Sequence, residues 1–168
     1  FNLAPRPGTD ELWVANTHAR NLVRFEPKLR GHVIDSRITR VSTGESGASD
    51  PIDLNADVEY AELPSDAALS MALSQPTDLV FDRDGDIAYV AAFGTDRIGV
   101  LDADGEVLAR IEVGDTPGAG VSPRTKRGPR ALALHASGDV LYVLNRLSNS
   151  VSVVDTRERK LVAEIALF

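Results

Sequence analysis

The sequence has 168 residues, of which 43% are hydrophobic and 26% are charged, and this composition is typical of one globular domain. Its 25 acidic and 18 basic residues give a net charge of −7, and this acidic balance, with only 5% aromatic residues, argues against nucleic-acid binding. The lack of cysteine excludes disulfides, thiolate metal sites and cysteine nucleophiles, and no apolar run approaches the roughly 18 residues of a membrane-spanning helix.

Three stretches of the chain repeat one pattern, in which an alternating apolar run is followed by a turn with glycine and by a run with an aromatic residue. The stretches span 2–14, 78–90 and 131–143. Glycine accepts the positive φ angles of tight hairpins, so each stretch is predicted to form two antiparallel strands. The aromatic residues recur at one place in every repeat and are expected to pack between neighbouring sheets; they are Trp13, Tyr89 and Tyr142.

Two more short apolar runs follow in each repeat, which gives four strands per unit. The third runs lie at 22–25, 98–101 and 151–154, and the fourth at 32–34, 107–111 and 161–165. Four-stranded units of roughly 40 to 45 residues are typical of β-propeller blades. We therefore predict an all-β fold, a partial β-propeller of three four-stranded antiparallel blades in one domain. The blades are expected at 1–41, 77–114 and 129–168, separated by an acidic insert at 42–76 and a basic insert at 115–128.

The acidic insert holds all of its charge as aspartate and glutamate, with no lysine or arginine between Thr43 and Gln75. Within it, Ser65 is expected to cap a short helix of about two turns. Alternate oxygen-bearing residues, as in a calcium-binding loop, occur at Asp53, Asn55, Asp57 and Glu59. Since Val58 and Pro64 stand where an EF-hand needs its turn glycine and its bidentate glutamate, a solvated acidic loop is the alternative to a calcium site.

The basic insert and the loops beside it carry a set of cationic side chains: Arg97, Arg124, Lys126, Arg127, Arg130 and Arg146. Converging guanidinium groups suit a carboxylate, a phosphate or a haem propionate, so these residues are candidates for binding an anion or a partner. Alternatively, they compensate the acids of the other insert through surface ion pairs. His18 is expected on the same face, as a general base, as an axial ligand donated across an interface, or as an exposed side chain.

Propeller geometry places both inserts at one end of the blades. One hypothesis is that this face binds a partner or ligand, because loops on a rigid scaffold commonly carry function. The alternative is that the two inserts pair with each other and only cover the scaffold. Aspartates at the opposite end are expected to be turn residues; they are Asp82, Asp84, Asp86, Asp102 and Asp104. Neither a Gly-x-Ser-x-Gly elbow nor a nucleophile–base spacing marks a hydrolase.

The motif Tyr142-Val143-Leu144-Asn145, followed by 147–155, resembles the YVTN-type β-propeller repeat, and 89–92 and 13–16 are similar. The resemblance implies stacked four-stranded blades, commonly about seven to a ring, in secreted or periplasmic proteins. Relatives include binding and surface proteins, lactonases, and propeller regions attached to c-type cytochrome or di-haem peroxidase domains. The third repeat is most similar to this last, cytochrome-linked group.

Three blades are too few to close a ring, which takes about four to eight. The sequence, which starts at Phe1, is therefore expected to be a trimmed chain or a piece of a larger propeller. Uncovered apolar flanks predict that this piece alone forms oligomers or aggregates. Its partners are expected to be the remaining blades, or other chains that complete the ring, and a cytochrome domain or another protein, with no nucleic acid and no membrane span.

The leading functional hypothesis is a non-catalytic binding or docking segment of a larger exported protein, periplasmic or extracellular by the resemblance. One alternative is the propeller part of a haem-containing redox protein of the cytochrome c or di-haem peroxidase type. A further alternative is a lactonase-like hydrolase. No cofactor is expected within the chain apart from the calcium alternative, and haem is expected only in an adjoining domain or partner.

Overall fold

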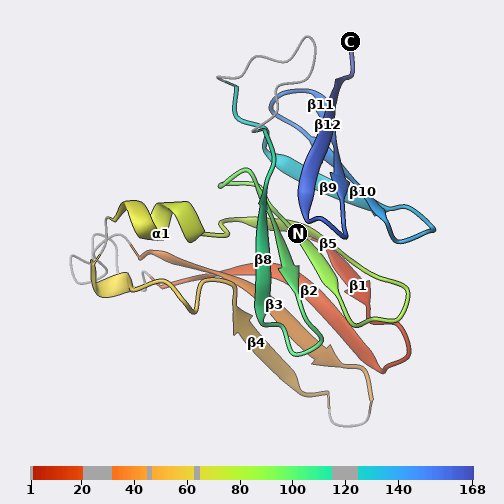
Figure 1. The fold of residues 1–168 in the computed structure, drawn as a ribbon. Coiled ribbons are helices and arrows are strands. Elements are labelled where there is room, and N and C mark those ends of the chain that lie inside the picture. Colours follow the sequence, from red (N-terminus) through yellow and green to blue (C-terminus); the bar gives the residue numbers. More distant parts are fainter. Residues whose placement is uncertain (1, 21–31, 45–46, 63–64, 115–124) are drawn as a thin grey trace.

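The computed structural model describes residues 2–20, 32–44, 47–62, 65–114 and 125–168. Its strands form three sheets of four strands each, arranged side by side (Figure 1). The first sheet contains β1 (Leu3–Pro5), β2 (Glu11–Ala19), β3 (Ile34–Ser42) and β4 (Ser49–Asp53). The second contains β5 (Pro76–Phe81), β6 (Ala88–Ala92), β7 (Arg97–Leu101) and β8 (Val107–Glu112). The third contains β9 (Pro129–Leu134), β10 (Val140–Asn145), β11 (Ser150–Asp155) and β12 (Lys160–Ala166).

All neighbouring strands within each sheet pair antiparallel and in chain order, so the predicted fold of three four-stranded blades is confirmed. A 3-10 helix (Tyr60–Glu62) and α1 (Asp66–Met71) lie between the first and second blades in the sequence. As predicted, Ser65 caps this helix, since its Oγ accepts a hydrogen bond from the Ala68 N–H. Among the described residues, no helix is long and apolar enough to cross a membrane.

The first blade departs from the predicted strand positions. Its third strand is β3 and its fourth is β4, whereas the sequence pattern placed them at 22–25 and 32–34. The first of these ranges lies outside the described residues, and the fourth strand falls inside the segment predicted as the acidic insert. Charged residues interrupt the alternation of apolar residues in β3 and β4, so the sequence pattern does not indicate these strands. In the fold, Arg40 of β3 pairs with Asp50 of β4. Pro51 is tolerated in β4 because this strand is the outermost of its sheet.

The three repeated aromatic residues hold one register position but differ in burial. Trp13, Tyr89 and Tyr142 each lie in the second strand of a blade, opposite Ala4, Val80 and Ala133 of the first strand. Trp13 is fully buried between the first and second blades, where its ring meets Phe81 edge to face, and Tyr89 is buried between the second and third. Tyr142 is 40% exposed, because no further sheet among the described residues covers the third blade.

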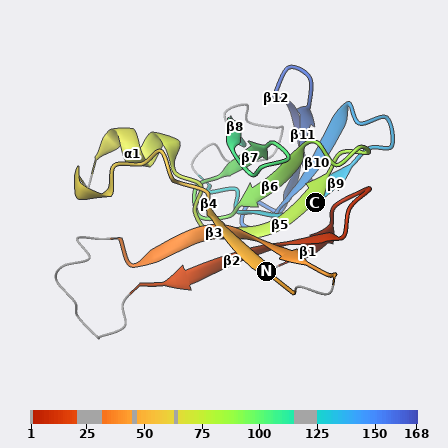
Figure 2. The same cartoon turned by 90° about the horizontal axis from the view of Figure 1, so that it is seen from below.

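A buried carboxylate connects the innermost strands of all three blades, which run close together in Figure 2. Asp78 of β5 accepts hydrogen bonds from the Asn2 side chain beside β1 and from the Leu132 N–H of β9, the latter at 2.7 Å. It also accepts one from the Leu79 N–H at 2.9 Å. Buried carboxylates are costly unless they are hydrogen-bonded, and the three donors meet this need. Asp78 therefore fixes the blades to one another at their inner edge.

Two equivalent turn glycines are expected to differ in their tolerance of alanine. Gly85 and Gly138 both adopt positive φ, 78° and 80°. A Cβ on Gly85 would lie 2.8 Å from the Pro7 carbonyl oxygen of the first blade, whereas one on Gly138 would have no heavy atom within 4 Å. Both substitutions should lower the free energy of unfolding by about 1 to 2 kcal/mol, because alanine is strained in the left-handed backbone region. The steric clash at Gly85→Ala should lower it by about a further 1 to 3 kcal/mol. Urea unfolding of both variants measures this difference, and equal losses would contradict it.

Candidate functional site

Four connections meet at one end of the blades, and we call this end the connection face. Its described residues are 54–62 with 65–75, 93–96, 113–114 with 125–128, and 146–149. Arg97 of β7 donates hydrogen bonds to the carbonyl oxygens of Leu69 (2.9 Å) and Ala72 (3.0 Å), which holds α1 against the second blade. A cavity of about 350 Å³ is lined by Leu69 on one side and by Thr125, Lys126 and Arg127 on the other, so described parts of both inserts lie at this end.

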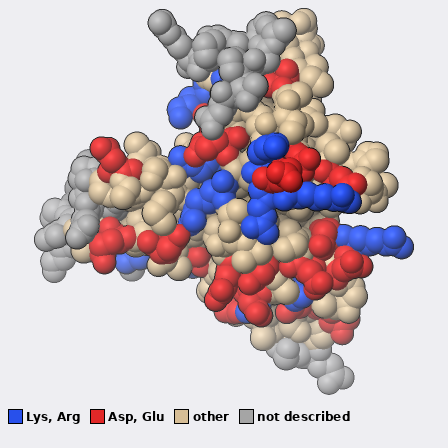
Figure 3. Space-filling model, in the orientation of Figure 1, with Lys and Arg blue, Asp and Glu red and all other residues tan. Residues whose placement is uncertain are grey.

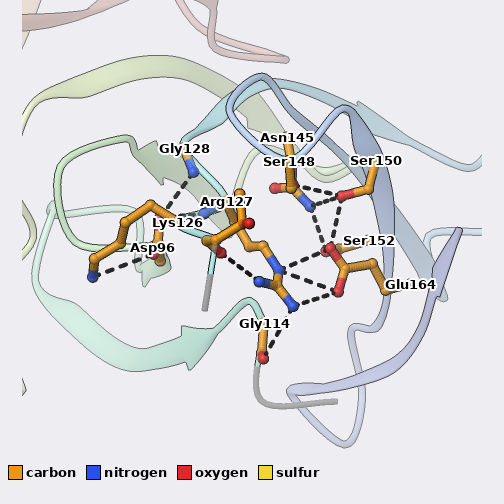
Figure 4. Close-up of polar contacts among 11 residues, drawn as sticks. Asp96, Gly114, Lys126, Arg127, Gly128, Asn145, Ser148, Ser150, Ser152 and Glu164 are labelled. Carbon is orange, nitrogen blue, oxygen red and sulfur yellow. Dashed lines mark hydrogen bonds and ion pairs between the residues drawn. The ribbon is translucent and has the colours of Figure 1, made fainter. Parts of the chain in front are cut away.

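Arg127 and Glu164 form a buried ion pair at this face (Figure 4). Their side chains are 2% and 0% exposed, and Arg127 Nε lies 2.9 Å from Glu164 Oε1. Ser150 of β11 donates a second hydrogen bond to the same carboxylate oxygen at 2.6 Å. The backbone N–H of Arg127 donates to Asp96 of the β6–β7 connection. The guanidinium thus fastens the connection between the second and third blades to β12 instead of facing an open surface.

The other predicted cationic residues are spread over the face. Arg97 forms an ion pair with Glu112, and Lys126 lies 3.4 Å from Asp96 with a side chain that is 74% exposed. Arg146 is exposed and Arg130 is half-buried, while Arg124 lies outside the described residues. Acidic and basic side chains lie next to one another across the view in Figure 3. Three of the six predicted cations, Arg97, Lys126 and Arg127, therefore lie in ion pairs with carboxylates. The side chains of Lys126 and Arg146 are exposed to solvent.

Two acids of the acidic insert pair with arginines of the blades. Asp57 accepts two hydrogen bonds of 2.8 Å from Arg110 of β8, and Asp50 pairs with Arg40 of β3. In the described part of the chain, the acidic partners of Lys126 and Arg127 are Asp96 and Glu164, which belong to the second and third blades. Each insert is thus bound to its neighbouring blade, and the described residues give no direct ion pair between the two inserts.

The four residues of the predicted calcium loop have other contacts. The Asn55 side chain is buried and pairs with the Leu73 backbone, accepting from its N–H at 2.7 Å and donating to its carbonyl at 3.0 Å. Asp53 accepts from the Asn55 N–H, Asp57 binds Arg110, and Glu59 accepts from the Ala61 N–H. No group of three or more metal-ligating side chains occurs among the described residues. The Asp57–Arg110 contact attaches this insert to the second blade, whereas the Asn55 contact with Leu73 lies within the insert.

A buried carboxylate at the end of β2 and β3 gathers basic groups from both strands and from the segments beside them. Asp35 lies 2.6 Å from Arg37 and 3.4 Å from Arg20, and its side chain is 7% exposed. His32 Nε2 lies 2.7 Å from the same carboxylate, and the exposed His18 Nδ1 lies at 3.6 Å. Of this cluster, only His18 was predicted from the sequence to be a site residue. The register explains the convergence, since His18 stands directly opposite Asp35.

The Asp35 cluster is expected to give a pH-dependent contribution to stability. Burial alone would raise the pKa of Asp35, but hydrogen bonds from Arg37 and Arg20 outweigh it, so that its pKa lies below the usual range. A lowered folded-state pKa stabilises the fold above the unfolded pKa of about 4, and this contribution is lost as the pH falls through the folded value. We expect Asp35→Asn to cost about 1 to 3 kcal/mol at pH 7 and progressively less below about pH 4.

Urea unfolding of both proteins between pH 7 and pH 3 measures this effect. A difference between Asp35→Asn and the parent protein that stays constant over this range would contradict the assignment. Asp66→Asn is a matched control, because Asp66 is an exposed carboxylate on α1.

Beside the Asp35 cluster, the connection face opens into a cavity of about 880 Å³. Its lining includes His32 with the two residues that follow it, Tyr60, and the side of α1. The rings of His32 and Tyr60 stack with their centroids 3.4 Å apart and an angle of 4° between their planes. Burial, with the nearby carboxylates of Asp53 and Asp35, raises the pKa of Tyr60 to about 12. The phenol is therefore neutral at physiological pH. This cavity was not predicted from the sequence.

One serine and one histidine do come together, at the opposite end of the third blade. His135 Nδ1 lies 2.9 Å from Ser137 Oγ. Ser137 also donates its backbone N–H to the same nitrogen at 3.2 Å, and its Oγ accepts from the Asp139 N–H. Both residues are exposed in the β9–β10 turn, and neither lines either of the two cavities described above. Their contacts are those of a hydrogen-bonded turn.

Solved structures similar to this chain have β-propeller folds. Hydrazine synthase from Kuenenia stuttgartiensis is similar over 92% of this chain, with a TM-score of 0.67 and 17% identity. A protein of unknown function from Desulfotomaculum acetoxidans gives 0.60 and 17% over 100% of this chain. A putative 6-phosphogluconolactonase from Bacteroides uniformis gives 0.59 and 15% over 98%. The chain spans 44%, 43% and 41% of these three proteins, and likeness at such identities establishes the fold alone.

A search of curated proteins finds no match. The family model described as lactonase, 7-bladed beta-propeller, matches residues 69–165, which is more than half of the 168-residue chain. The resemblance stated from the sequence is confirmed at the level of the β-propeller, and the link to YVTN repeats and cytochromes stays a prediction. This chain therefore belongs to the lactonase family of seven-bladed β-propellers.

Proposed function

We propose that this chain is a non-catalytic segment of a larger exported β-propeller protein and that it binds a protein partner through the connection face. The observation that carries the proposal is the way separate connections are fixed to one another. Arg97 holds α1, and Asp96 with Glu164 holds the backbone and side chain of Arg127. A surface that is already ordered loses little conformational entropy on binding. On this surface Lys126 and Arg146 remain exposed for contact with a partner.

Further blades are the second partner that we propose. On the third blade, Tyr142 and Leu144 of β10 point to the uncovered face, and both are about 40% exposed. Cross-strand pairing places Val151, Val153 and Ile165 on the same face. Tyr142 has the register position of Trp13 and Tyr89, which are covered by the next blade. The chain spans 41–44% of the three similar structures, about what three blades of seven would occupy. We propose that a fourth blade, from the same polypeptide or another, packs against this face of the third blade.

Lactone hydrolysis is a second candidate, favoured by the description of the family. Within the described residues, the groups best placed for it are His32 and Asp35 beside the large cavity, as a base and its orienting carboxylate.

A role in a haem-containing redox protein is a third candidate, which rests on the resemblance to cytochrome-linked propellers. Visible absorption of the native protein tests this third candidate directly.

Lysine labelling tests the docking proposal. Lys126 lies on the connection face, whereas Lys160 follows the β11–β12 turn at the opposite end, and both side chains are well exposed at 74% and 60%. We expect acetylation of Lys126 to be several-fold slower in the native protein, isolated from its source, than in the 168-residue chain alone. Lys160 should react equally in both.

Two outcomes would overturn the proposal. Equal rates at Lys126 in the native protein and in the isolated chain would mean that the connection face is not the contact surface. Hydrolysis of glucono-δ-lactone by the native protein, above the rate in buffer and lost in His32→Gln, would replace docking with lactone hydrolysis as the function.

A further inference from the structure

We infer that the cavity of about 880 Å³ beside α1 is a binding site for an uncharged aromatic small molecule. This goes beyond the docking role, and neither depends on the other. The volume falls within the roughly 300 to 1,000 Å³ of pockets that hold drug-sized ligands. The site lies between the end of the first blade and α1, and it is formed by side chains of the described residues.

Apolar side chains form most of the cavity wall. They are Val33, Ile34, Val58, Ala68, Leu69 and Ala72. Val33, Ile34 and Leu69 are 48%, 43% and 67% exposed, which is unusual for large apolar residues gathered around one hollow. A ligand that covers them removes apolar surface from water, and this is the main source of affinity that the site offers.

Most polar groups of the lining that would recognise a polar ligand already have partners within the protein. The Asn55 amide is fully used by the Leu73 backbone, and Ser65 Oγ accepts from the Ala68 N–H. Ser36 Oγ accepts from the Gln75 N–H, and the Tyr60 hydroxyl is hydrogen-bonded to Asp53. A charged or strongly polar ligand would lose its hydration on entering and gain few hydrogen bonds in return. The lining therefore favours a ligand without charge.

The stacked rings of His32 and Tyr60 account for the preference for an aromatic ligand. Their planes differ by only 4°, so they form one flat, rigid part of the lining. His32 Nε2 lies 2.7 Å from Asp35 Oδ1, and the His32 side chain is only 10% exposed. Aromatic rings favour offset or edge contacts with other rings, which gives a ring-shaped ligand an attraction beyond its buried area.

The experiment uses N-phenyl-1-naphthylamine, an uncharged aromatic dye that fluoresces in apolar surroundings, with the 168-residue chain. We expect saturable binding of one dye per chain. Filling the cavity with Ala68→Phe, or making its rim polar with Val33→Ser, should weaken binding at least about tenfold, a change of about 1.4 kcal/mol. Since Val33 is half exposed, its variant is expected to remain folded even if Ala68→Phe does not.

Matched controls separate this site from other apolar surface. Leu144→Ser changes the uncovered face of the third blade, where Leu144 is 41% exposed, and should leave dye affinity unchanged. The negatively charged sulfonated analogue of the dye should bind at least about tenfold more weakly than the neutral dye. The inference is overturned by an absence of saturable binding, by a loss of binding in Leu144→Ser but not in Val33→Ser, or by equal affinity for the charged analogue.

Discussion

Replacing Arg127 with methionine is expected to lower the free energy of unfolding by about 3 to 5 kcal/mol. The substitution removes the cation that pairs with Glu164, whose carboxylate is 0% exposed. The Ser150 hydroxyl remains as a donor but cannot neutralise the carboxylate. Because Arg127 also joins the second and third blades, the loss should affect the docking of the whole third blade.

Chemical denaturation of a small set of variants tests this expectation. Adding Glu164→Gln to Arg127→Met should recover part of the loss, because glutamine removes the buried charge and still offers an oxygen to Ser150. Lys126→Met is the matched control, as its side chain is 74% exposed and its pair with Asp96 should contribute at most about 1 kcal/mol. A loss at Arg127 no larger than that at Lys126 would contradict the role assigned to the buried pair.

The second large effect is expected at the repeated aromatic position. Trp13→Ala should cost about 3 to 5 kcal/mol, because it empties the interface between the first and second blades where the ring is fully buried. Tyr142→Ala should cost less than about 1 kcal/mol in the same chain, although Tyr142 has the same register position, since its ring is 40% exposed. The difference between the two losses measures how much a covering blade adds to the free energy of unfolding.

Urea unfolding at low protein concentration measures both losses. In a native protein whose ring is complete, Tyr142→Ala should become as costly as Trp13→Ala. If the two substitutions were equally costly in the isolated chain at every concentration, the third blade would already be covered and the partial-propeller interpretation would fail. A cost at Tyr142 that grows with protein concentration would show that chains associate through this face.

The sequence predicted the second and third blades well because their strands follow local rules. Residues 78–81 and 88–92 are apolar runs on either side of a turn with Gly85, and the third blade repeats this with Gly138. The first blade failed these rules. Its β3 carries Asp35, Arg37 and Arg40 among its apolar residues; Arg37 pairs with Asp35 within the strand, and Arg40 pairs with Asp50 of β4. The alternation of apolar and polar residues therefore predicts a strand only where the strand carries no charged residues that form ion pairs in the fold.

The end of the blades that carries the site was predictable, but the contacts within it were not. Strand order alone places the connections together. By contrast, Asn55 contacts Leu73, eighteen positions away, and Asp78 contacts Asn2 and Leu132, which are 76 and 54 positions away. In a sequence, such residues cannot be told from the turn aspartates and asparagines that propellers use at many hairpins. Their roles depend on burial and on partners that only the folded chain supplies.

The carboxylate of Asp78 has a consequence for how this molecule comes apart. Its hydrogen-bond donors come from the strand regions that begin each of the three blades. If either outer blade separates from the second blade, the buried carboxylate loses one of these donors. An intermediate with two intact blades is therefore penalised on either side. The three blades should melt together in one cooperative transition, unlike many linear repeat arrays, whose units unravel from the ends.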